Sequence, residues 1–326
     1  MLELNRIYNM DCLERMQEIP DKSIDLVIAD PPYFQVMRED WQGNKYEWDN
    51  QWNALQDYVN WIGTIGSEFK RILKDNGSLY IFADDKICAY VQVELDKIFH
   101  LENPITWVKP NNLTMKGWGG YCSYAPITER ILFYSKETEK TDCFKAIKEY
   151  MRGERAAIIE ANGFKTQEEF NHYINGVTNT ASVVSRHYFP DSQWVFPTVG
   201  IYALLQTTGF FKREYEELRR EYEELRRPFN QKTNYTDVWE FNIMGGLETS
   251  IHPTQKPLKL ICRIVETSSK ENGIVLDPFM GSGTTAVAAI RTGRNFIGFE
   301  KEQTYFDAAQ IRIKKAQEQG KISEWF

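Results

Sequence analysis

The strongest constraint on the fold is a short apolar run, Ile24 to Ala29, that ends directly at Asp30-Pro31-Pro32-Tyr33. A nearly continuous apolar run of this length is typical of a strand buried on both faces of a parallel sheet. The carboxyl ends of such strands open onto the crevice in which open α/β sheets bind ligands. The pattern therefore predicts a ligand or catalytic site at Asp30.

The residue types of this turn indicate what the site can bind. Two consecutive prolines fix the turn, and Asp30, which precedes a proline, is restricted to an extended conformation. An amino group fits the resulting acceptors, with one hydrogen on the Asp30 carboxylate and the other on the Pro31 carbonyl. The ring of Tyr33 offers a surface for stacking a planar base, worth about 1–3 kcal/mol per base. The alternative is a proline turn that only ends the strand.

A second strand and turn lie far along the chain. Gly273 to Leu276 has the composition of a strand, and Asp277 to Thr285 follows as a glycine-bearing turn that opens a helix. Gly281 and Gly283 let the backbone approach a ligand closely, and a helix N-terminus favours a carboxylate. The turn lacks the lysine of a phosphate-binding loop, which argues against a nucleoside triphosphate. The next strand ends at Glu300, where doubly wound folds place the acid that binds ribose hydroxyls, so a nucleoside ligand fits.

Together the two motifs resemble those of bacterial DNA amino-methyltransferases. Asp30-Pro31-Pro32-Tyr33 is similar to their catalytic motif, and Asp277 to Thr285 is similar to their S-adenosylmethionine motif. The order, with the catalytic motif first and the cofactor motif last, is that of the permuted β group found in restriction-modification systems. Asn9 to Leu13 resembles the segment that faces the cofactor's adenine, and His252 to Leu258 resembles the segment that packs beside the cofactor.

The resemblance implies a set of site residues. The implied catalytic residues are Asp30, Pro31, Pro32 and Tyr33. The implied cofactor contacts are Asp11, Asp30, Thr254, Lys256, Asp277, Phe279, Gly281, Ser282, Gly283, Thr284 and Glu300. Asp11 also stands where an aspartate commonly caps a helix, so a cap and a cofactor ligand are both open for it.

The alternation of strands and helices predicts an α/β fold with a mostly parallel sheet covered on both faces. The resemblance implies the permuted, doubly wound class I methyltransferase fold, with residues 1–135 and 245–326 as the catalytic and cofactor-binding domain. Residues 136–244 interrupt the pattern, and we expect an inserted, mainly helical target-recognition domain there. Within it a heptad occurs twice, at 214–227, and predicts an amphipathic helix, although two heptads are too few to decide on a homodimer. A helix-turn-helix about Asn175-Gly176 is a further hypothesis for the insert.

Two loops beside the predicted site carry aromatic and basic residues. Residues 34–52 show no sustained period and are interpreted either as a DNA-facing lid or as a surface loop anchored by tryptophans. The segments 105–112 and 129–134 are expected to form a strand hairpin. The loop between them contains basic and aromatic residues that suit phosphate and base contacts, although a solvated loop explains them as well: Lys109, Lys116, Trp118 and Tyr121.

Composition narrows the classes of function. The 326-residue chain has a formal net charge of −7, which counts mildly against DNA binding unless lysines and arginines cluster locally. Its five cysteines form no Cys-x-x-Cys pair and none follows a proline, whereas methylation at a cytosine carbon is expected to use a Pro-Cys nucleophile. The four histidines show no metal-ligand spacing, so no metal site is predicted. Without a membrane-length apolar run or a secretion signal, the chain is expected to be cytoplasmic and free of membranes.

The resulting hypothesis is a site-specific methyltransferase that moves a methyl group from S-adenosylmethionine to adenine N6 in double-stranded DNA by base flipping. An aspartate at the first position of the catalytic motif favours adenine in the resembled family, and cytosine N4 is the alternative. The same resemblance names a cognate restriction endonuclease as a candidate partner. Two other classes stay open: a catalytically silent S-adenosylmethionine-binding regulator that recognises DNA, and an enzyme that methylates a protein glutamine or an RNA base. Such enzymes usually carry Asn at the position of Asp30.

Overall fold

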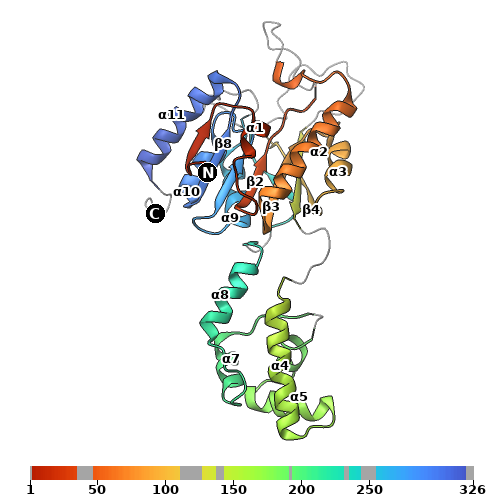
Figure 1. Ribbon diagram of the computed structural model, residues 1–326. Helices are drawn as coiled ribbons and strands as arrows, with labels where there is room; N and C mark the ends of the chain where they lie inside the picture. The colour runs from red at the N-terminus through yellow and green to blue at the C-terminus, as the bar shows by residue number, and fades with distance from the viewer. Residues whose placement is uncertain are drawn as a thin grey trace. The chain divides into compact units, whose positions relative to one another are not determined.

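The computed structural model describes residues 2–34, 47–110, 127–136, 143–190, 193–230, 235–243 and 255–320 (Figure 1). The chain divides into two compact units. The first unit consists of Met1–Glu139 and Arg227–Phe326, and the second unit is Lys140–Arg226. Among the described helices, none is both long and apolar enough to cross a membrane.

The first unit is built on one sheet with the strand order β1-β8-β7-β2-β3-β5-β4-β6. Its strands are β1 (Arg6–Tyr8), β2 (Ile24–Ala29), β3 (Leu73–Ala83), β4 (His100–Val108), β5 (Thr128–Ser135), β6 (Val238–Glu240), β7 (Ile274–Asp277) and β8 (Asn295–Phe299). The five strands β1, β8, β7, β2 and β3 pair in parallel in that order. Strand β5 is antiparallel to β3 and to β4, and β6 is parallel to β4. The predicted mostly parallel sheet and the predicted hairpin of β4 with β5 are therefore confirmed. Figure 1 shows β1 and β8, from opposite ends of the chain, side by side.

Helices cover both faces of this sheet, as the apolar run of β2 predicts. On one face Val27 and Ala29 belong to a core shared with α1, α2 and α3. On the other face Leu26 and Ile28 belong to a core shared with α9 and with Ala288 of α10, while α10 and α11 together cover β1 and β8. These helices are α1 (Cys12–Met16), α2 (Leu55–Ile72), α3 (Cys88–Leu95), α9 (Leu258–Ser268), α10 (Thr284–Thr292) and α11 (Gln303–Gln319), and a short 3-10 turn, η1, spans Glu47–Asp49.

The second unit is helical and has its own apolar core. Its helices are α4 (Lys145–Asn162), α5 (Gln167–Thr178), α6 (Val183–His187), α7 (Val199–Gln206) and α8 (Tyr215–Leu225). The repeated heptad forms α8, and Leu218 is buried while Tyr215, Tyr222 and Leu225 pack against the core, so the predicted amphipathic helix is confirmed.

Two boundaries within and beside the insert differ from the sequence-based expectation. The turn expected at Asn175-Gly176 lies inside α5, which continues to Thr178 and ends at Asn179 in the left-handed conformation. Asparagine tolerates the left-handed conformation, so Asn179 can end the helix, whereas the helix continues through Asn175-Gly176. The strand β6 pairs in parallel with β4 through Trp239 and Trp107, which places it in the sheet of the first unit although the expected insert extends to residue 244.

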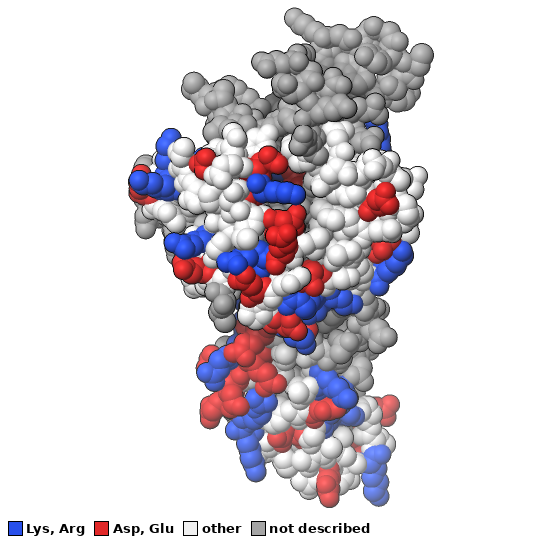
Figure 2. Space-filling model, turned by 45° about the horizontal axis from the view of Figure 1, so that its top comes forward, with Lys and Arg blue, Asp and Glu red and all other residues white. Residues whose placement is uncertain are grey.

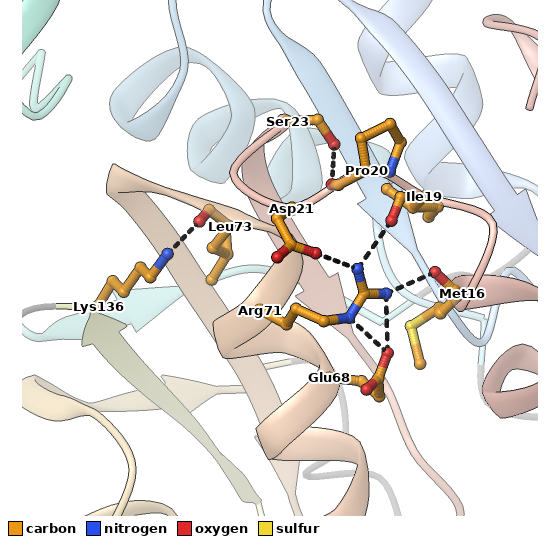
Figure 3. Close-up of polar contacts among 9 residues, drawn as sticks. All are labelled: Met16, Ile19, Pro20, Asp21, Ser23, Glu68, Arg71, Leu73 and Lys136. Atoms are coloured by element: carbon orange, nitrogen blue, oxygen red, sulfur yellow. Dashed lines mark hydrogen bonds and ion pairs between the residues drawn. The ribbon is translucent and has the colours of Figure 1, made fainter. Parts of the chain in front are cut away.

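Arg71, at the end of α2, forms hydrogen bonds with α1, with the segment between α1 and β2, and with Glu68 of its own helix (Figure 3). Its guanidinium donates to the carbonyl oxygens of Met16 and Ile19, both at 2.9 Å. The same group donates to Asp21 at 2.6 Å and to Glu68 at 2.9 Å. Because these bonds hold the chain that enters β2, they help to set the position of Asp30 at the far end of that strand.

We expect Arg71→Met to lower the free energy of unfolding by about 2–3 kcal/mol, because it leaves two carbonyls and two carboxylates without their donor. Urea denaturation measures the change. The matched control is Arg6→Met, which removes only a solvent-exposed pair with Glu3 and should change stability by less than about 1 kcal/mol. Equal losses in the two variants would contradict a structural role for the Arg71 bonds.

Candidate active site

One pocket at the carboxyl edge of the sheet brings the two sequence motifs together. The turn after β2 contributes Asp30 to Tyr33, and the turn after β7 contributes Asp277 to Ser282. The remaining wall comes from the start of α1, the start of α10 and the end of β8, with Asp11, Thr284 and Glu300. Figure 2 shows Asp and Glu side chains, with a basic side chain between them, near the centre of the face of the first unit that it draws.

At the turn after β2, Asp30 lies in a cluster of buried charges. Lys256 Nζ is 2.7 Å from Asp30 Oδ2 and 3.1 Å from Glu129 Oε1. The hydroxyl oxygen of Tyr33 is 2.5 Å from Asp30 Oδ1 and 2.6 Å from Glu129 Oε1. Lys109 Nζ lies 2.6 Å from the other Glu129 oxygen. We call these five residues the acid-lysine cluster.

Burial and the mutual charges of this cluster shift its pKa values in different directions. Burial raises the pKa of Asp30, and the nearby Lys256 ammonium offsets part of that rise. For Glu129, burial also raises the pKa, but Lys256 and Lys109 together bring it below its ordinary value. Burial alone would lower the pKa of Lys256, yet the two carboxylates raise it, so the lysine stays charged. Two carboxylates and two ammonium groups thus stabilise one another out of water.

Backbone and aromatic contacts hold the turn after β2 in place. The backbone N–H of Tyr33 donates to the buried Asp49 carboxylate at 2.5 Å. Phe34 follows with a φ of 53°, a left-handed conformation that is strained for a bulky side chain, and its ring packs 5.7 Å from Tyr58. Trp61, which lines the pocket, lies 5.8 Å from Phe279 of the other motif. The aromatic layer therefore connects the two turns.

The turn after β7 has the features expected for a nucleoside site. Gly281 has a φ of 53°, and its N–H donates to Glu300 Oε2 at 2.7 Å. The other Glu300 oxygen accepts the N–H of Glu302 at 2.8 Å. Among the described residues no side chain caps the N-terminus of α10, and Arg312 donates to Ser282 Oγ at 2.7 Å just before it. The first backbone amides of α10 and the Arg312 guanidinium thus lie close together beside the pocket.

Asp11 and Asp277 both combine a local structural bond with a place in the pocket wall. Asp11 accepts the N–H of Leu13 at 2.9 Å and caps α1, so the helix-cap interpretation is confirmed. Asp277 accepts the N–H of Phe279 at 2.9 Å. Burial raises the pKa of Asp277 to about 7, which makes it half ionised near neutral pH.

Most of the predicted site residues line this single pocket: Asp11, Asp30, Pro31, Pro32, Tyr33, Lys256, Asp277, Phe279, Gly281, Ser282, Thr284 and Glu300. Gly283 is not in the pocket wall. Its φ is 84°, and a Cβ there would lie 3.1 Å from Ala309 Cβ, so the glycine lets the turn pack closely against α11. Thr254 lies outside the described residues, as do Lys116, Trp118, Tyr121 and most of the expected lid.

Several residues of the site were missed by the sequence analysis. Glu129 was interpreted only as part of a hairpin strand, and a single acid at a strand start carries no specific signal. Asp49 and Tyr305 line the pocket without belonging to a recognisable motif. Gln255 lines it from the segment His252 to Leu258, although it was not among the predicted site residues. The proximity of Glu129 to Asp30 depends on strand pairing that no local pattern specifies.

Comparison with known proteins identifies the family. Residues 24–311 match the N6/N4 family described as DNA methylase. The chain belongs to the N6/N4 DNA methylase family. This match confirms the resemblance that the two motifs indicate. The methylase is 27% identical to the Type II methyltransferase M.HinfI of Haemophilus influenzae, over 96% of this chain and 69% of the relative. It is also 27% identical to the DNA adenine methyltransferase YhdJ of Escherichia coli, over 96% of this chain and 84% of the relative.

Solved structures with low sequence identity share the fold of the methylase. The M1.HpyAVI–SAM complex matches with a TM-score of 0.53 and 22% identity, over 94% of this chain and 98% of that one. The cytosine-N4-specific PvuII DNA methyltransferase matches with a TM-score of 0.54 and 15% identity, over 98% of this chain and 92% of that one. The class I methyltransferase fold is therefore confirmed.

The raised pKa of Asp277 predicts a pH-dependent stability. A carboxyl whose pKa is about 7 in the folded methylase and 3.8 ordinarily stabilises the fold when protonated. That contribution is present below pH 4 and is lost as the pH rises to 7. Asp277→Asn does not titrate, so relative to wild type its free energy of unfolding should rise by about 2–3 kcal/mol between pH 5 and pH 8. Urea denaturation at the two pH values measures this.

The control is Asp307→Asn, at an exposed position on α11. A stability difference between Asp277→Asn and wild type that is the same at both pH values would contradict the interpretation.

Proposed function

We propose that this methylase transfers a methyl group from S-adenosylmethionine to adenine N6 in double-stranded DNA. The observation that carries the proposal is the single pocket that holds both the acceptor turn at Asp30 and the nucleoside turn at Gly281. A methyl carbon and an exocyclic amine can meet only if their binding groups share one space. The family match supports DNA as the substrate, and the M1.HpyAVI structure, of the same fold, is a complex with SAM.

The residues of the pocket fit S-adenosylmethionine. Glu300 is placed to accept ribose hydroxyls, and the uncapped start of α10 beside Arg312 suits a carboxylate. The acids Asp11 and Asp277 suit a ligand that carries positive charge. Once bound, the cofactor supplies an electrophilic methyl group on a sulfonium.

The catalytic turn is suited to prepare the amine. An aromatic amine is a poor nucleophile because its lone pair is delocalised into the ring. The Asp30 carboxylate and the Pro31 carbonyl can each accept one amine hydrogen, which localises the lone pair and aims it into the pocket. The base reaches this geometry only outside the duplex, and flipping it costs a few kcal/mol that stacking on Tyr33 offsets in part.

Adenine is favoured over cytosine by two observations. An aspartate, Asp30, stands at the first position of the catalytic motif, and one relative is named a DNA adenine methyltransferase. The likeness to the cytosine-N4-specific PvuII enzyme, at 15% identity, concerns the fold alone.

Product analysis tests the function. Duplex DNA, RNA and protein are incubated with the methylase and S-adenosylmethionine, and the digested products are identified by mass. N6-methyl-2′-deoxyadenosine from duplex DNA is expected. Asp30→Ala should abolish it while leaving cofactor affinity within about threefold, because the proposed role of Asp30 is to bind the amine, whereas most of the implied cofactor contacts come from other residues. N4-methylcytosine would shift the assignment to the alternative base. Methylated RNA or protein, or cofactor binding without any product, would overturn the proposal.

The second unit is proposed to read the DNA sequence, as the resemblance implies for residues 136–244. Four basic residues of α4 recur on one helix face: Lys145, Lys148, Arg152 and Arg155. We call these four residues the α4 stripe. Figure 2 shows basic and acidic side chains interspersed over this unit, so the stripe does not extend into a larger basic surface. A homodimer and a cognate endonuclease stay predictions; two relatives are named Type II methyltransferases.

If the α4 stripe contacts phosphates, Lys148→Glu with Arg152→Glu should weaken DNA binding at least tenfold and reduce the dependence of log K on log salt by about two. Fluorescence anisotropy with a labelled duplex containing the methylated site measures both. Arg219→Glu with Arg220→Glu on α8 changes the net charge equally and serves as the control. Equal effects of the two pairs would indicate a general charge effect instead of a binding face.

A further inference from the structure

Glu129 is a buried acid of the site for which the proposed reaction has no use. It comes from β5, is 7% exposed, and lies outside both sequence motifs. Its two oxygens contact three partners: the Tyr33 hydroxyl at 2.6 Å, Lys256 at 3.1 Å and Lys109 at 2.6 Å. Within the described part of the chain, Tyr33 and Lys256 are also the two groups that donate to the Asp30 carboxylate.

The Tyr33 hydroxyl lies between two acceptors but has one proton to donate. Its oxygen is 2.5 Å from Asp30 and 2.6 Å from Glu129. A phenol can donate to one carboxylate at a time. Whichever carboxylate receives the proton, the other must be satisfied by a different donor. Lys256, with three N–H bonds, lies within 3.1 Å of both carboxylates.

The substrate amine needs the same oxygen atoms. With Tyr33 and Lys256 both donating to Asp30, the carboxylate already accepts a bond at each oxygen. Each carboxylate oxygen can accept a second bond, but a hydrogen bond already made to an oxygen reduces the negative charge that it offers to the amine hydrogen. If the Tyr33 proton turns to Glu129 instead, Asp30 Oδ1 keeps its charge for the amine hydrogen, and Lys256 still donates to Asp30 Oδ2.

We propose that Glu129 is a positioning residue, which accepts the Tyr33 proton and shares Lys256 so that the Asp30 carboxylate can receive the amine of the base. This inference rests on the proposed function. Glu129 does not touch the base, and no proton is consumed, since the Tyr33 hydroxyl only changes its acceptor. Lys109 holds the outer Glu129 oxygen and so keeps the inner one directed at Tyr33.

The charged groups that face Asp30 affect its pKa, so the proposal can be tested by the pH dependence of kcat. The titratable groups that face Asp30 are Tyr33 in its own turn, Glu129 from β5, Lys256 ahead of α9, Tyr58 from α2 and Asp277 from β7. Glu129 raises the pKa of Asp30 by charge repulsion. Removing its charge should therefore lower that pKa and move the acid limb of kcat to lower pH, since Asp30 acts when ionised.

The experiment compares steady-state methylation of duplex DNA by wild type, Glu129→Gln, Tyr33→Phe and the double variant across pH. Wild-type turnover to N6-methyl-2′-deoxyadenosine tests the proposed function by itself. We expect Glu129→Gln to lower kcat about tenfold with an unchanged KM for S-adenosylmethionine, and to move the acid limb to lower pH. In the Tyr33→Phe background, where no hydroxyl competes for Asp30, the same change should have a much smaller effect on kcat.

A second variant distinguishes the proposed kinetic effect from an effect of misfolding. Glu129→Gln with Lys109→Gln removes both partners of a buried pair, so no unpaired charge is left at that contact, and the same kinetic defect is expected. The proposal is overturned if the effect of Glu129→Gln on kcat is equal with and without the Tyr33 hydroxyl. An acid limb that stays in place, or moves to higher pH, overturns it as well.

Discussion

The parallel pairing of β2 with β7 is the constraint on which the rest of the site depends. Leu26 lies opposite Val275 and Val27 opposite Leu276, so the two strands end at the same edge of the sheet. The turns that follow them carry Asp30 and Gly281, which are far apart in the chain but line one pocket. The order of the motifs along the chain therefore does not matter to the chemistry, because adjacency in the sheet replaces adjacency in sequence.

A concentration of buried acids at that edge sets the electrostatic character of the pocket. Burial raises the pKa values of Asp30, Asp277 and Glu300, so each carboxylate is less stable in its charged form than in water. Such an arrangement works against folding and favours a ligand that brings positive charge into the pocket. A sulfonium nucleoside with an ammonium group meets that requirement, whereas a nucleoside phosphate does not. The acidity of the site thus explains why a net charge of −7 is compatible with the proposed cofactor.

The fold and the two turns could be predicted from the sequence because their signals are local. The apolar run of β2 indicates burial on both faces, and both Asp30-Pro31-Pro32-Tyr33 and the glycines of the second turn carry their chemistry within a few residues. The heptads of α8 indicate a helix for the same reason. The end of α5 was placed wrongly because an Asn-Gly pair is compatible with both a turn and a helix interior, and the packing of Phe170 and Ile174 decided between them. Gly283 shows a related limit: a glycine in a binding motif can be required by packing against α11 instead of by the ligand.

Glu129 could not be found in this way, because its place in the site is a consequence of strand direction. The last residues of a parallel strand lie at the carboxyl edge of the sheet, where functional groups are expected from the sequence. Since β5 runs antiparallel to β3, its first residues lie at that edge instead. The carboxyl end of β4 reaches the same edge, and Lys109, which follows it, places its ammonium 2.6 Å from Glu129. The reversed strand thus introduces an acid and its counter-ion beside Asp30, and this buried carboxylate gains a neighbour that shares the Tyr33 hydroxyl and Lys256 with it.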